Sequence, residues 1–450
     1  MKKLLLLGLV LALFSCQEEP KIDYAIVSGQ IENPTDKTVS LFQGREKITE
    51  MTLDQDGKFS DTLKIENGYY NLDHGREMAS LYLEQGDNII VTLDTKEFDE
   101  TISFSGIGSE NNTYLSKKVL FDENSNFDFE KVYAMNEMEF MATMEEVKSS
   151  KLELLKSVEN VGETFRTNEL KNINYEYLVN LQNYQPAHRY YTKNSEFKPS
   201  EEFLKRLEDI DYTNESDYNN SQYYQRLVQS HYSEKIRNTD NPADIFKMIN
   251  AEAFPKLKQD LADMLNFQIS PNNEHNEDYY NGLMALSSDE KYKENLTIKY
   301  NKMKKLVKGK PSPQFTDYEN HKGGTTSLED LKGKYVYVDV WATWCGPCIS
   351  EIPSLKQVEK DFHGKNIAFV STSIDRAKDH NTWVEMVKNK QLGGTQLMAD
   401  NAWQSKFVQD YAIEGIPRFI LIDPDGNIVS ADAPRPSDPR LVEMFKELKL

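Results

Sequence analysis

The chain has 450 residues, more than one hydrophobic core usually organises, so the sequence predicts several domains. It carries 53 Lys and Arg against 73 Asp and Glu, and this net charge of −20 repels nucleic acid phosphates and anionic lipid headgroups. A nucleic-acid-binding function is therefore close to excluded. The three cysteines, Cys16, Cys345 and Cys348, are too few for a disulfide-stapled scaffold or a cysteine-rich zinc module.

Residues 1–15 have the pattern of an export signal. Two lysines precede an apolar run, residues 4–14, which is shorter than the roughly 20 residues needed to cross a bilayer. A serine and Cys16 follow, and the whole pattern resembles a bacterial lipoprotein signal, in which the cysteine becomes the lipidated first residue. The resemblance implies a lipid anchor at Cys16, on a membrane facing the periplasm.

Two alternatives stay open for this segment. One is an ordinary cleaved signal that contains a cysteine. The other concerns location, because the glutamate-bearing residues 17–20 resemble a surface-export signal of some Bacteroidota lipoproteins. Display on the outer membrane or the cell surface is therefore kept beside the periplasmic location.

Residues 16–108 are predicted to form a small antiparallel β domain. Apolar and polar residues alternate in 25–31, 58–63 and 88–93, and glycine-containing turns precede the second and third of these runs. Such alternation turns one face of each strand towards a core.

Residues 109–309 are predicted to form a helical domain. Apolar residues recur three and four apart in 140–158, 170–181, 203–210 and 245–265. The region is also rich in tyrosine, and tyrosines at helical spacing favour an amphipathic core over a groove for a peptide or a glycan.

Pro311 and Pro313 mark the start of a third domain, residues 310–450. The two prolines follow a lysine-rich helix end and would break it. All four tryptophans lie beyond this point, so the composition changes together with the pattern.

The third domain contains a Cys-x-x-Cys motif between a strand and a helix. The apolar, β-branched and aromatic run 335–341 leads into Trp344-Cys345-Gly346-Pro347-Cys348, and helical spacing follows. Cys345 would lie at the helix start, where unpaired N–H groups and the positive end of the helix dipole favour the nucleophilic thiolate. Cys348, in the first turn, could then attack a mixed disulfide at Cys345 and release the reduced substrate. Pro347 fits this turn because its missing N–H costs little there.

The motif resembles that of thioredoxin, and the region 310–450 resembles the TlpA/ResA group of exported thioredoxin-like proteins. The resemblance implies an α/β thioredoxin fold, with Cys345 and Cys348 as a redox-active disulfide. Asp339 matches the family's buried carboxylate, which shuttles a proton for the second cysteine. A carboxylate inside an apolar strand should have a raised pKa, as a proton shuttle requires.

The resemblance also assigns a substrate-binding surface. Pro417 matches the family's cis-proline, which packs beside the cysteines and leaves the backbone of the preceding residue, Ile416, free to pair with an extended substrate. Trp344, Gly346 and Pro347 are expected to form the rest of this surface. In layout, residues 16–108 resemble the β-rich module that precedes a thioredoxin domain in Bacteroidota lipoproteins.

Two features depart from plain thioredoxin. The lysine that partners the buried carboxylate in many thioredoxins falls at Ser371 here, so Asp339 lacks that partner. Residues 376–400, with a helix expected around 383–388, resemble the insertion that separates the TlpA/ResA group from thioredoxin and borders its active site.

Other readings of these residues are weaker. The cysteine pair could be half of a zinc site, but there is no second pair and the histidines lack ligand spacing, so neither a metal nor a cofactor is expected. Peroxiredoxins share the thioredoxin fold, but their motif would need a proline at Val338 and a threonine at Ala342. Peroxidase activity is therefore only a minor alternative. Asp339 could instead be a satisfied core carboxylate without a role in catalysis.

The sequence thus predicts a membrane-anchored thiol–disulfide oxidoreductase of the cell envelope. The Gly346-Pro347 dipeptide and Ile416 resemble those of reducing thioredoxins, so we expect it to reduce disulfides of exported proteins. The resemblance implies a membrane thiol reductant of the CcdA/DsbD type as electron donor, and c-type cytochrome biogenesis as a setting. The alternative is a tethered binding lipoprotein whose first two domains capture one client for the redox domain.

Overall fold

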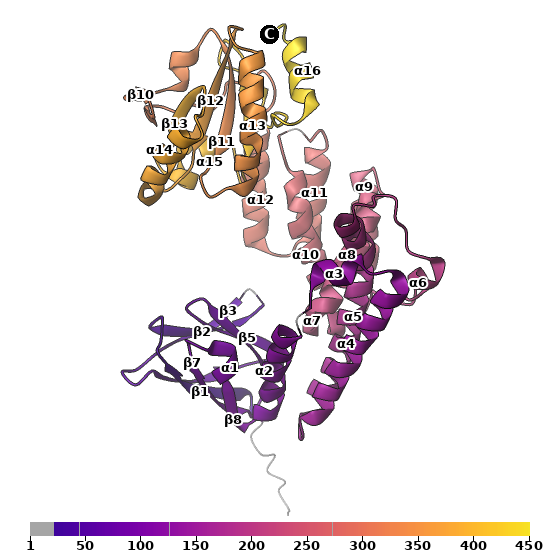
Figure 1. Ribbon diagram of the computed structural model, residues 1–450. Coiled ribbons are helices and arrows are strands. Elements are labelled where there is room, and N and C mark those ends of the chain that lie inside the picture. Colours follow the sequence, from indigo (N-terminus) through magenta and orange to yellow (C-terminus); the bar gives the residue numbers. More distant parts are fainter. Residues whose placement is uncertain (1–21, 45, 126, 272) are drawn as a thin grey trace, which may run out of the picture. The chain divides into compact units, whose positions relative to one another are not determined.

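The computed structural model describes residues 22–44, 46–125, 127–271 and 273–450 (Figure 1). The predicted signal, residues 1–15, and the predicted lipidation site, Cys16, lie outside these residues. Among the residues that are described, no helix is both long enough and apolar enough to cross a membrane.

The chain forms two compact units, which divide between Lys235 and Ile236. This division falls inside the helical stretch 109–309, so its helices are shared between the two units. The division into separate domains at 16–108, 109–309 and 310–450 stays a prediction.

The N-terminal unit begins with two sheets that share one core, with strand orders β4-β1-β7-β8 and β3-β2-β5-β6. Neighbouring strands run antiparallel, as predicted, except that β1 and β7 run parallel. Parallel neighbours need a long connection between them, and the chain from β2 to β6 supplies it. The elements are β1 (Tyr24–Glu32), β2 (Thr38–Gln43), β3 (Glu46–Thr52), β4 (Lys58–Lys64), β5 (Gly68–His74), β6 (Glu77–Leu83), β7 (Asn88–Asp94), α1 (Phe98–Thr101) and β8 (Ser103–Ile107).

Helices complete this unit and bond to its strands. The fully buried Asn112 side chain accepts a hydrogen bond from the N–H of Tyr82 at 2.8 Å and donates one to its carbonyl at 3.0 Å. Buried Glu169 accepts from the Tyr69 hydroxyl at 2.7 Å and pairs with the Lys118 ammonium at 2.9 Å. The helices are α2 (Ser109–Asn124), α3 (Phe129–Ala134), α4 (Glu137–Ser157), α5 (Glu163–Thr192), α6 (Glu201–Lys205), α7 (Glu215–Asn220) and α8 (Gln222–Arg237).

Half of the sixteen tyrosines of the helical region are buried, as the predicted amphipathic core requires, whereas Tyr190 is 67% exposed. Tyr114, Tyr184, Tyr218 and Tyr224 are all buried. One helix is shorter than its apolar pattern: the stretch 203–210 is α-helical only as far as Lys205.

The C-terminal unit begins with helices α9 (Pro242–Glu252), α10 (Pro255–Leu265), α11 (Asn276–Leu286) and α12 (Glu290–Met303). The helical spacing predicted over 245–265 is confirmed, and it is divided between α9 and α10 by a break in the chain. Pro255 explains the break: it has no N–H for a preceding carbonyl, and it occupies the first turn of the second helix.

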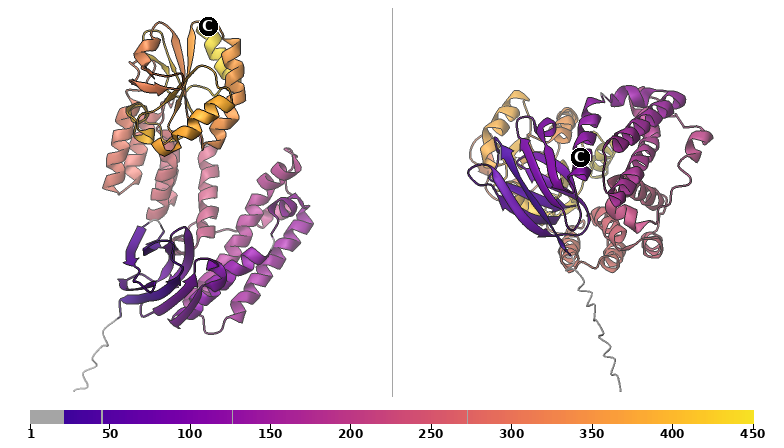
Figure 2. Two further views of the ribbon diagram at one scale, coloured as in Figure 1. Left: turned by 60° about the vertical axis from the view of Figure 1, so that its left-hand side comes forward. Right: turned by 90° about the horizontal axis from the view of Figure 1, so that it is seen from below.

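A mixed sheet follows, with helices on both faces (Figure 2). Its strand order is β10-β9-β13-β12-β11-β14-β15, with β11 parallel to β12 and antiparallel to β14. The order confirms the predicted α/β thioredoxin fold, and β11 covers the predicted strand 335–341. The elements are β9 (Tyr318–Asn320), β10 (Thr325–Thr326), β11 (Tyr335–Trp341), α13 (Gly346–Asp361), β12 (Ile367–Ser373), α14 (His380–Asn389), β13 (Thr395–Met398), α15 (Lys406–Asp410), β14 (Arg418–Ile422), β15 (Ile428–Ser430) and α16 (Pro439–Glu447).

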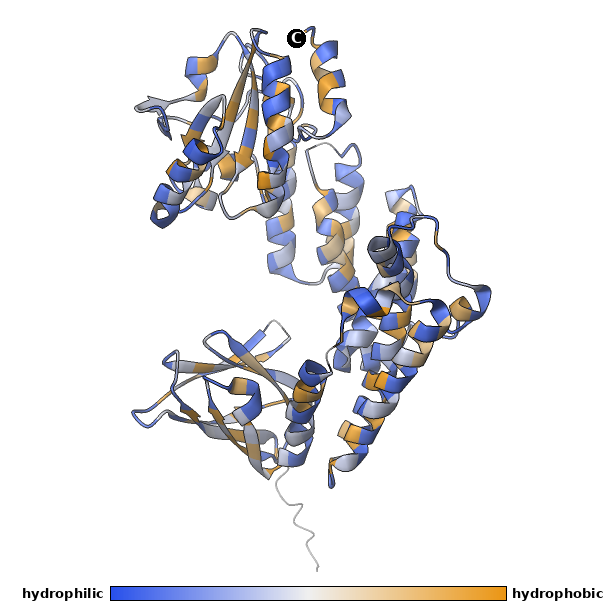
Figure 3. Ribbon diagram, viewed as in Figure 1, coloured by the Kyte–Doolittle hydropathy of each residue, from blue (hydrophilic) through white to orange (hydrophobic). Residues whose placement is uncertain are grey.

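Apolar residues concentrate on the central strands of this sheet (Figure 3). On one face, Tyr337 of β11 belongs to a core that includes Leu355 of α13 and Phe445 of α16. Side chains alternate along a strand, so Asp339 points to the same face as Tyr337. The only charged residue of β11 is therefore directed towards the layer that contains α13.

Candidate active site

The Cys-x-x-Cys motif lies at the junction of β11 and α13, as predicted. Cys345 is the N-cap residue of α13, and its Sγ accepts a hydrogen bond from the Cys348 N–H at 3.1 Å. The two residues form a disulfide, with their Cα atoms 5.3 Å apart. After reduction, the same N–H and the helix dipole would favour a thiolate at Cys345.

The two cysteines face different surroundings. Trp344, Gly346 and Pro347 are exposed around Cys345, and Trp344 also contacts the Trp403 ring, with 6.4 Å between centroids. Cys348, in contrast, lines a small internal cavity together with Asp339. An incoming substrate can therefore approach the Cys345 side of the disulfide, while Cys348 faces the interior.

Asp339 lies in the middle of β11 and is 9% exposed. Ser371 of β12 is its cross-strand neighbour, where many thioredoxins have a lysine, and Ser371 is also buried. Burial raises the pKa of Asp339 to about 8, a hydrogen bond from Ser371 lowers it, and the charges of Glu351 and Glu359 raise it further. Burial is the largest cause, so Asp339 holds a proton at neutral pH without help from a lysine.

Glu351 is a buried carboxylate that the sequence analysis missed. It lies on α13, three residues after Cys348, and its oxygens accept hydrogen bonds from the Ser437 N–H at 3.0 Å and the Ser437 hydroxyl at 2.8 Å. Its spacing from Cys348 could have drawn attention to it. Its partner could not have been foreseen, because Ser437 follows it by 86 residues.

Asp375 fixes the chain that enters the motif, and it was also missed as a site residue. It is 1% exposed, and its carboxylate accepts hydrogen bonds from the Thr343 N–H at 3.0 Å and the Thr343 hydroxyl at 2.8 Å. The Ser373 hydroxyl donates a further hydrogen bond at 2.6 Å. These contacts tie the end of β12 to the residue that precedes Trp344.

Pro417 lies next to the Cys-x-x-Cys motif because β14 pairs with β11. The Ile416–Pro417 peptide bond is cis, and both residues are partly exposed. In the antiparallel pair of β11 and β14, Arg418 lies opposite Val340, so Pro417 lies next to the end of β11, where the cysteine loop begins. The predicted site residues on the two segments are therefore neighbours.

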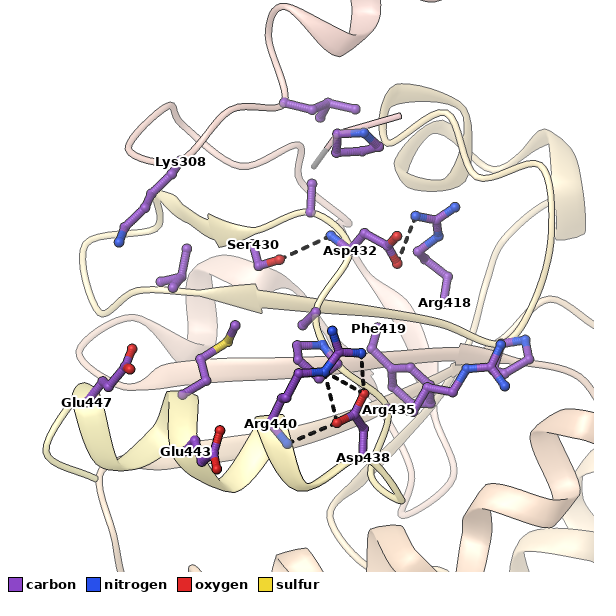
Figure 4. Close-up of a pocket in the computed structure, with 18 of the residues that line it drawn as sticks. Lys308, Arg418, Phe419, Ser430, Asp432, Arg435, Asp438, Arg440, Glu443 and Glu447 are labelled. Atoms are coloured by element: carbon purple, nitrogen blue, oxygen red, sulfur yellow. Dashed lines mark hydrogen bonds and ion pairs between the residues drawn. The ribbon is translucent and has the colours of Figure 1, made fainter. Parts of the chain in front are cut away.

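A pocket of about 970 Å³ extends from Pro417 over the β15 side of the sheet towards α16 (Figure 4). Phe419, Val429 and Met444 contribute apolar surface to it. Its charged residues include two ion pairs, Arg418 with Asp432 at 3.0 Å and Arg440 with Asp438, together with Lys308 and Arg435. The pocket can receive a polar, extended chain segment that starts at the cis-proline.

The other wall of this pocket comes from the end of the helical segment that precedes the sheet. Leu306, Val307 and Lys308 line the pocket. The chain just after them pairs with β15: the Gly309 N–H donates to the Ile428 carbonyl, and the Ile428 N–H donates to the Lys310 carbonyl, both at 2.8 Å. Among the described residues, no group of three or more His, Cys, Asp or Glu side chains is placed to hold a metal ion.

Comparisons with known proteins agree with this chemistry. A family model for Redoxin matches residues 307–444, a span that contains Asp339, both cysteines of the motif and Pro417. The thiol-disulfide oxidoreductase ResA of Bacillus thuringiensis (strain Al Hakam) is 33% identical over 129 residues, which are 28% of this chain and 69% of ResA. The thioredoxin-like protein YneN of Bacillus subtilis (strain 168) is 27% identical over 123 residues, which are 27% of this chain and 69% of YneN.

Solved structures with similar sequences come from Bacteroides. A solution structure from Bacteroides vulgatus is 51% identical, covers 31% of this chain and 90% of its own, and has a TM-score of 0.28. A thiol-disulfide oxidoreductase from Bacteroides fragilis NCTC 9343 is 30% identical, covers 31% of this chain and 99% of its own, and also has a TM-score of 0.28.

Proposed function

Because the chain belongs to the TlpA/ResA-like group of thioredoxin-family thiol–disulfide oxidoreductases, we propose that it reduces disulfides of exported proteins from a lipid anchor on the cell envelope. The observation that carries the proposal is the Cys345–Cys348 disulfide at the start of α13, with exposed residues around Cys345 and the cis-proline beside it.

The exchange follows from the separate surroundings of the two cysteines. In the reduced protein, the Cys345 thiolate attacks a client disulfide, so that one client sulfur bonds to Cys345 and the other leaves as a thiolate. Cys348 then transfers its proton to the Asp339 carboxylate and attacks the Cys345 sulfur. The intramolecular disulfide forms, and the second client sulfur leaves as a thiolate, so the client gains the two electrons that the protein loses.

The protein must then be reduced again, and a membrane thiol reductant of the CcdA/DsbD type is the proposed donor. Its thiolate attacks Cys345, Cys348 leaves, and the proton held by Asp339 returns to Cys348. The donor's second thiol then attacks the donor sulfur of this mixed disulfide, so that Cys345 leaves as a thiolate and the donor ends as a disulfide. The pKa of about 8 supports the proton transfer to Cys348, because Asp339 is protonated in the disulfide form at neutral pH.

The proposed location is a membrane facing the periplasm, with the outer membrane or the cell surface as further sites. The lipoprotein-like pattern that ends in Cys16 supports this anchor. In the sequence, the β-rich and helical segments lie between Cys16 and the redox domain.

The second candidate function is service to one dedicated client, captured by the β-rich and helical segments. Half of the tyrosines of the helical region, among them Tyr114, Tyr184 and Tyr224, are buried and cannot line a capture groove, which favours the general reductase. An apocytochrome c is one proposed client, since its Cys-x-x-Cys-His site accepts haem only as free thiols.

The test is to trap clients with Cys348→Ser in the native host. This variant cannot release a client from Cys345, so mixed disulfides should accumulate. A general reductase predicts several clients, and a dedicated one predicts a single recurring client. Recovery of none, from a variant that is stably produced, would contradict both. In the same strain, labelled palmitate should be incorporated into the parent and not into Cys16→Ala, and a parent without label would contradict the anchor.

A further inference from the structure

The internal cavity behind Cys348 combines the chemical groups of a proton path. Its lining includes Asp339, Trp341, Cys348, Glu359, Ser371 and Gln396. The volume available to the centre of a water molecule is about 10 Å³, which is room for a single water.

Two polar atoms of this lining need such a water. The Trp341 Nε1–H, a donor, and the Gln396 Oε1, an acceptor, are buried and have no hydrogen-bond partner within the described part of the chain. Unpaired buried polar atoms are rare in proteins, and ordered water is their usual partner. One water that accepts from Trp341 and donates to Gln396 would satisfy both.

Glu359 is the carboxylate of this cavity that also reaches solvent. It lies on α13, eleven residues after Cys348, and is partly exposed, whereas Asp339 is buried. Gly393 and Gly394 leave space for its carboxylate, because an added Cβ would lie 2.2 Å and 3.0 Å from its two oxygens. The lining thus runs from Cys348 and Asp339 inside to Glu359 at the surface.

The charges that face Glu359 come from three elements. Lys356 lies one turn earlier on α13, Lys322 comes from the turn between β9 and β10, and Asp339 comes from β11. Both ammonium groups bond to carbonyl oxygens, Lys356 to Lys390 and Lys322 to Gly394 at 3.2 Å. Burial raises the pKa of Glu359 and the two lysines lower it again.

We propose that Glu359 passes protons between Asp339 and solvent through the hydrated cavity each time Cys348 alternates between thiol and disulfide. The inference rests on the proposed thiol–disulfide exchange. Before disulfide formation the Asp339 proton moves through the water to the Glu359 carboxylate and on to bulk water, and the freed Asp339 carboxylate then takes the Cys348 proton and keeps it in the disulfide form. Re-reduction runs the same path in reverse, so no proton is created or lost. Glu359 takes over the link to solvent in a site where serine occupies the lysine position of many thioredoxins.

This role has a kinetic consequence. Asp339 is largely protonated at pH 7, because its pKa is about 8, and it must lose that proton before it can accept the one from Cys348. The attack of Cys348 should therefore depend on proton exit through Glu359. A purely electrostatic role makes the opposite prediction: removing the charge of Glu359 would lower the pKa of Asp339 and speed the attack at pH 7.

The experiment mixes the reduced full chain with 5,5′-dithiobis(2-nitrobenzoate) in a stopped-flow spectrometer. Cys345 releases the first chromophore when the mixed disulfide forms, and Cys348 releases the second when it attacks. For Glu359→Gln at pH 7 we expect the second phase to slow about tenfold, with the first phase unchanged. Asp361→Asn, at an exposed position on the same helix, should leave both phases unchanged.

The other outcomes are decisive. A second phase that is unchanged or faster in Glu359→Gln would overturn the relay. Glu359→Asp keeps a carboxylate and should retain at least half of the rate, so a loss as large as that of Glu359→Gln would also overturn it. If the parent protein itself shows no second phase, the thiol–disulfide exchange fails rather than the relay.

Discussion

At the scale of single residues, Asp339 is where sequence and structure agree most closely. A lone carboxylate in an apolar strand predicts a raised pKa, and burial at that position is indeed its main cause. The sequence could not show that Glu351 and Glu359 add to it, because helix spacing alone does not tell which side chains face a given strand position. Ser371 opposite Asp339 also follows only from the pairing of β11 and β12.

The raised pKa makes a prediction for stability. The unfolded chain releases the Asp339 proton near the ordinary pKa of 3.8, whereas the folded chain holds it until about pH 8. The free energy of unfolding of the parent should therefore fall between pH 4 and pH 8 and not change further above that range from this group. Asp339→Asn removes the effect, so it should be more stable than the parent, by at most about 6 kcal/mol at pH 8.

Urea denaturation of the oxidised proteins across this pH range measures the difference. The expected result is a gap between variant and parent that widens as the pH rises. A gap that is constant from pH 4 to pH 8 would show that Asp339 does not hold its proton in the folded protein.

At the scale of elements, the strand, turn and helix around the motif could be predicted, but the distant contacts that hold them in place could not. Strand β11 and helix α13 follow from apolar runs and from the position of Pro347 in the first turn. The contact between Asp375 and Thr343 joins residues 32 apart in sequence, and no local pattern indicates it. Likewise, the split between α9 and α10 shows that Pro255 outweighs a continuous apolar period.

The Asp375 contact can be tested by Asp375→Ala. The change leaves the Thr343 N–H and two hydroxyl groups without their acceptor at a buried site, so the free energy of unfolding should fall by about 2 kcal/mol. Glu385→Ala, at an exposed position on α14, is the control and should change stability by less than about 0.5 kcal/mol. Chemical denaturation of both variants gives the comparison, and equal stability of the two would contradict the anchoring role.

At the scale of the whole molecule, the recognisable chemistry lies in the C-terminal unit. The cysteines, Asp339 and Pro417 all fall within the span that matches Redoxin, and fixed spacing made them visible in the sequence. In the N-terminal unit, composition and periodicity predicted strands, helices and an aromatic core. They could not show that Asn112 and Glu169 would bond helices to strands within one unit, because those partners are distant in sequence.

The central claim is that Cys345 attacks the client and Cys348 releases it. The most direct measurement is reduction of a model disulfide protein by the purified chain with dithiothreitol as electron source, followed by mass spectrometry of the enzyme. The parent should turn over, and Cys345→Ser should be inactive. Cys348→Ser, reduced and then freed of dithiothreitol before it meets the client, should carry the client on Cys345. Turnover by Cys345→Ser, or a client bound to Cys348 in that variant, would contradict the mechanism.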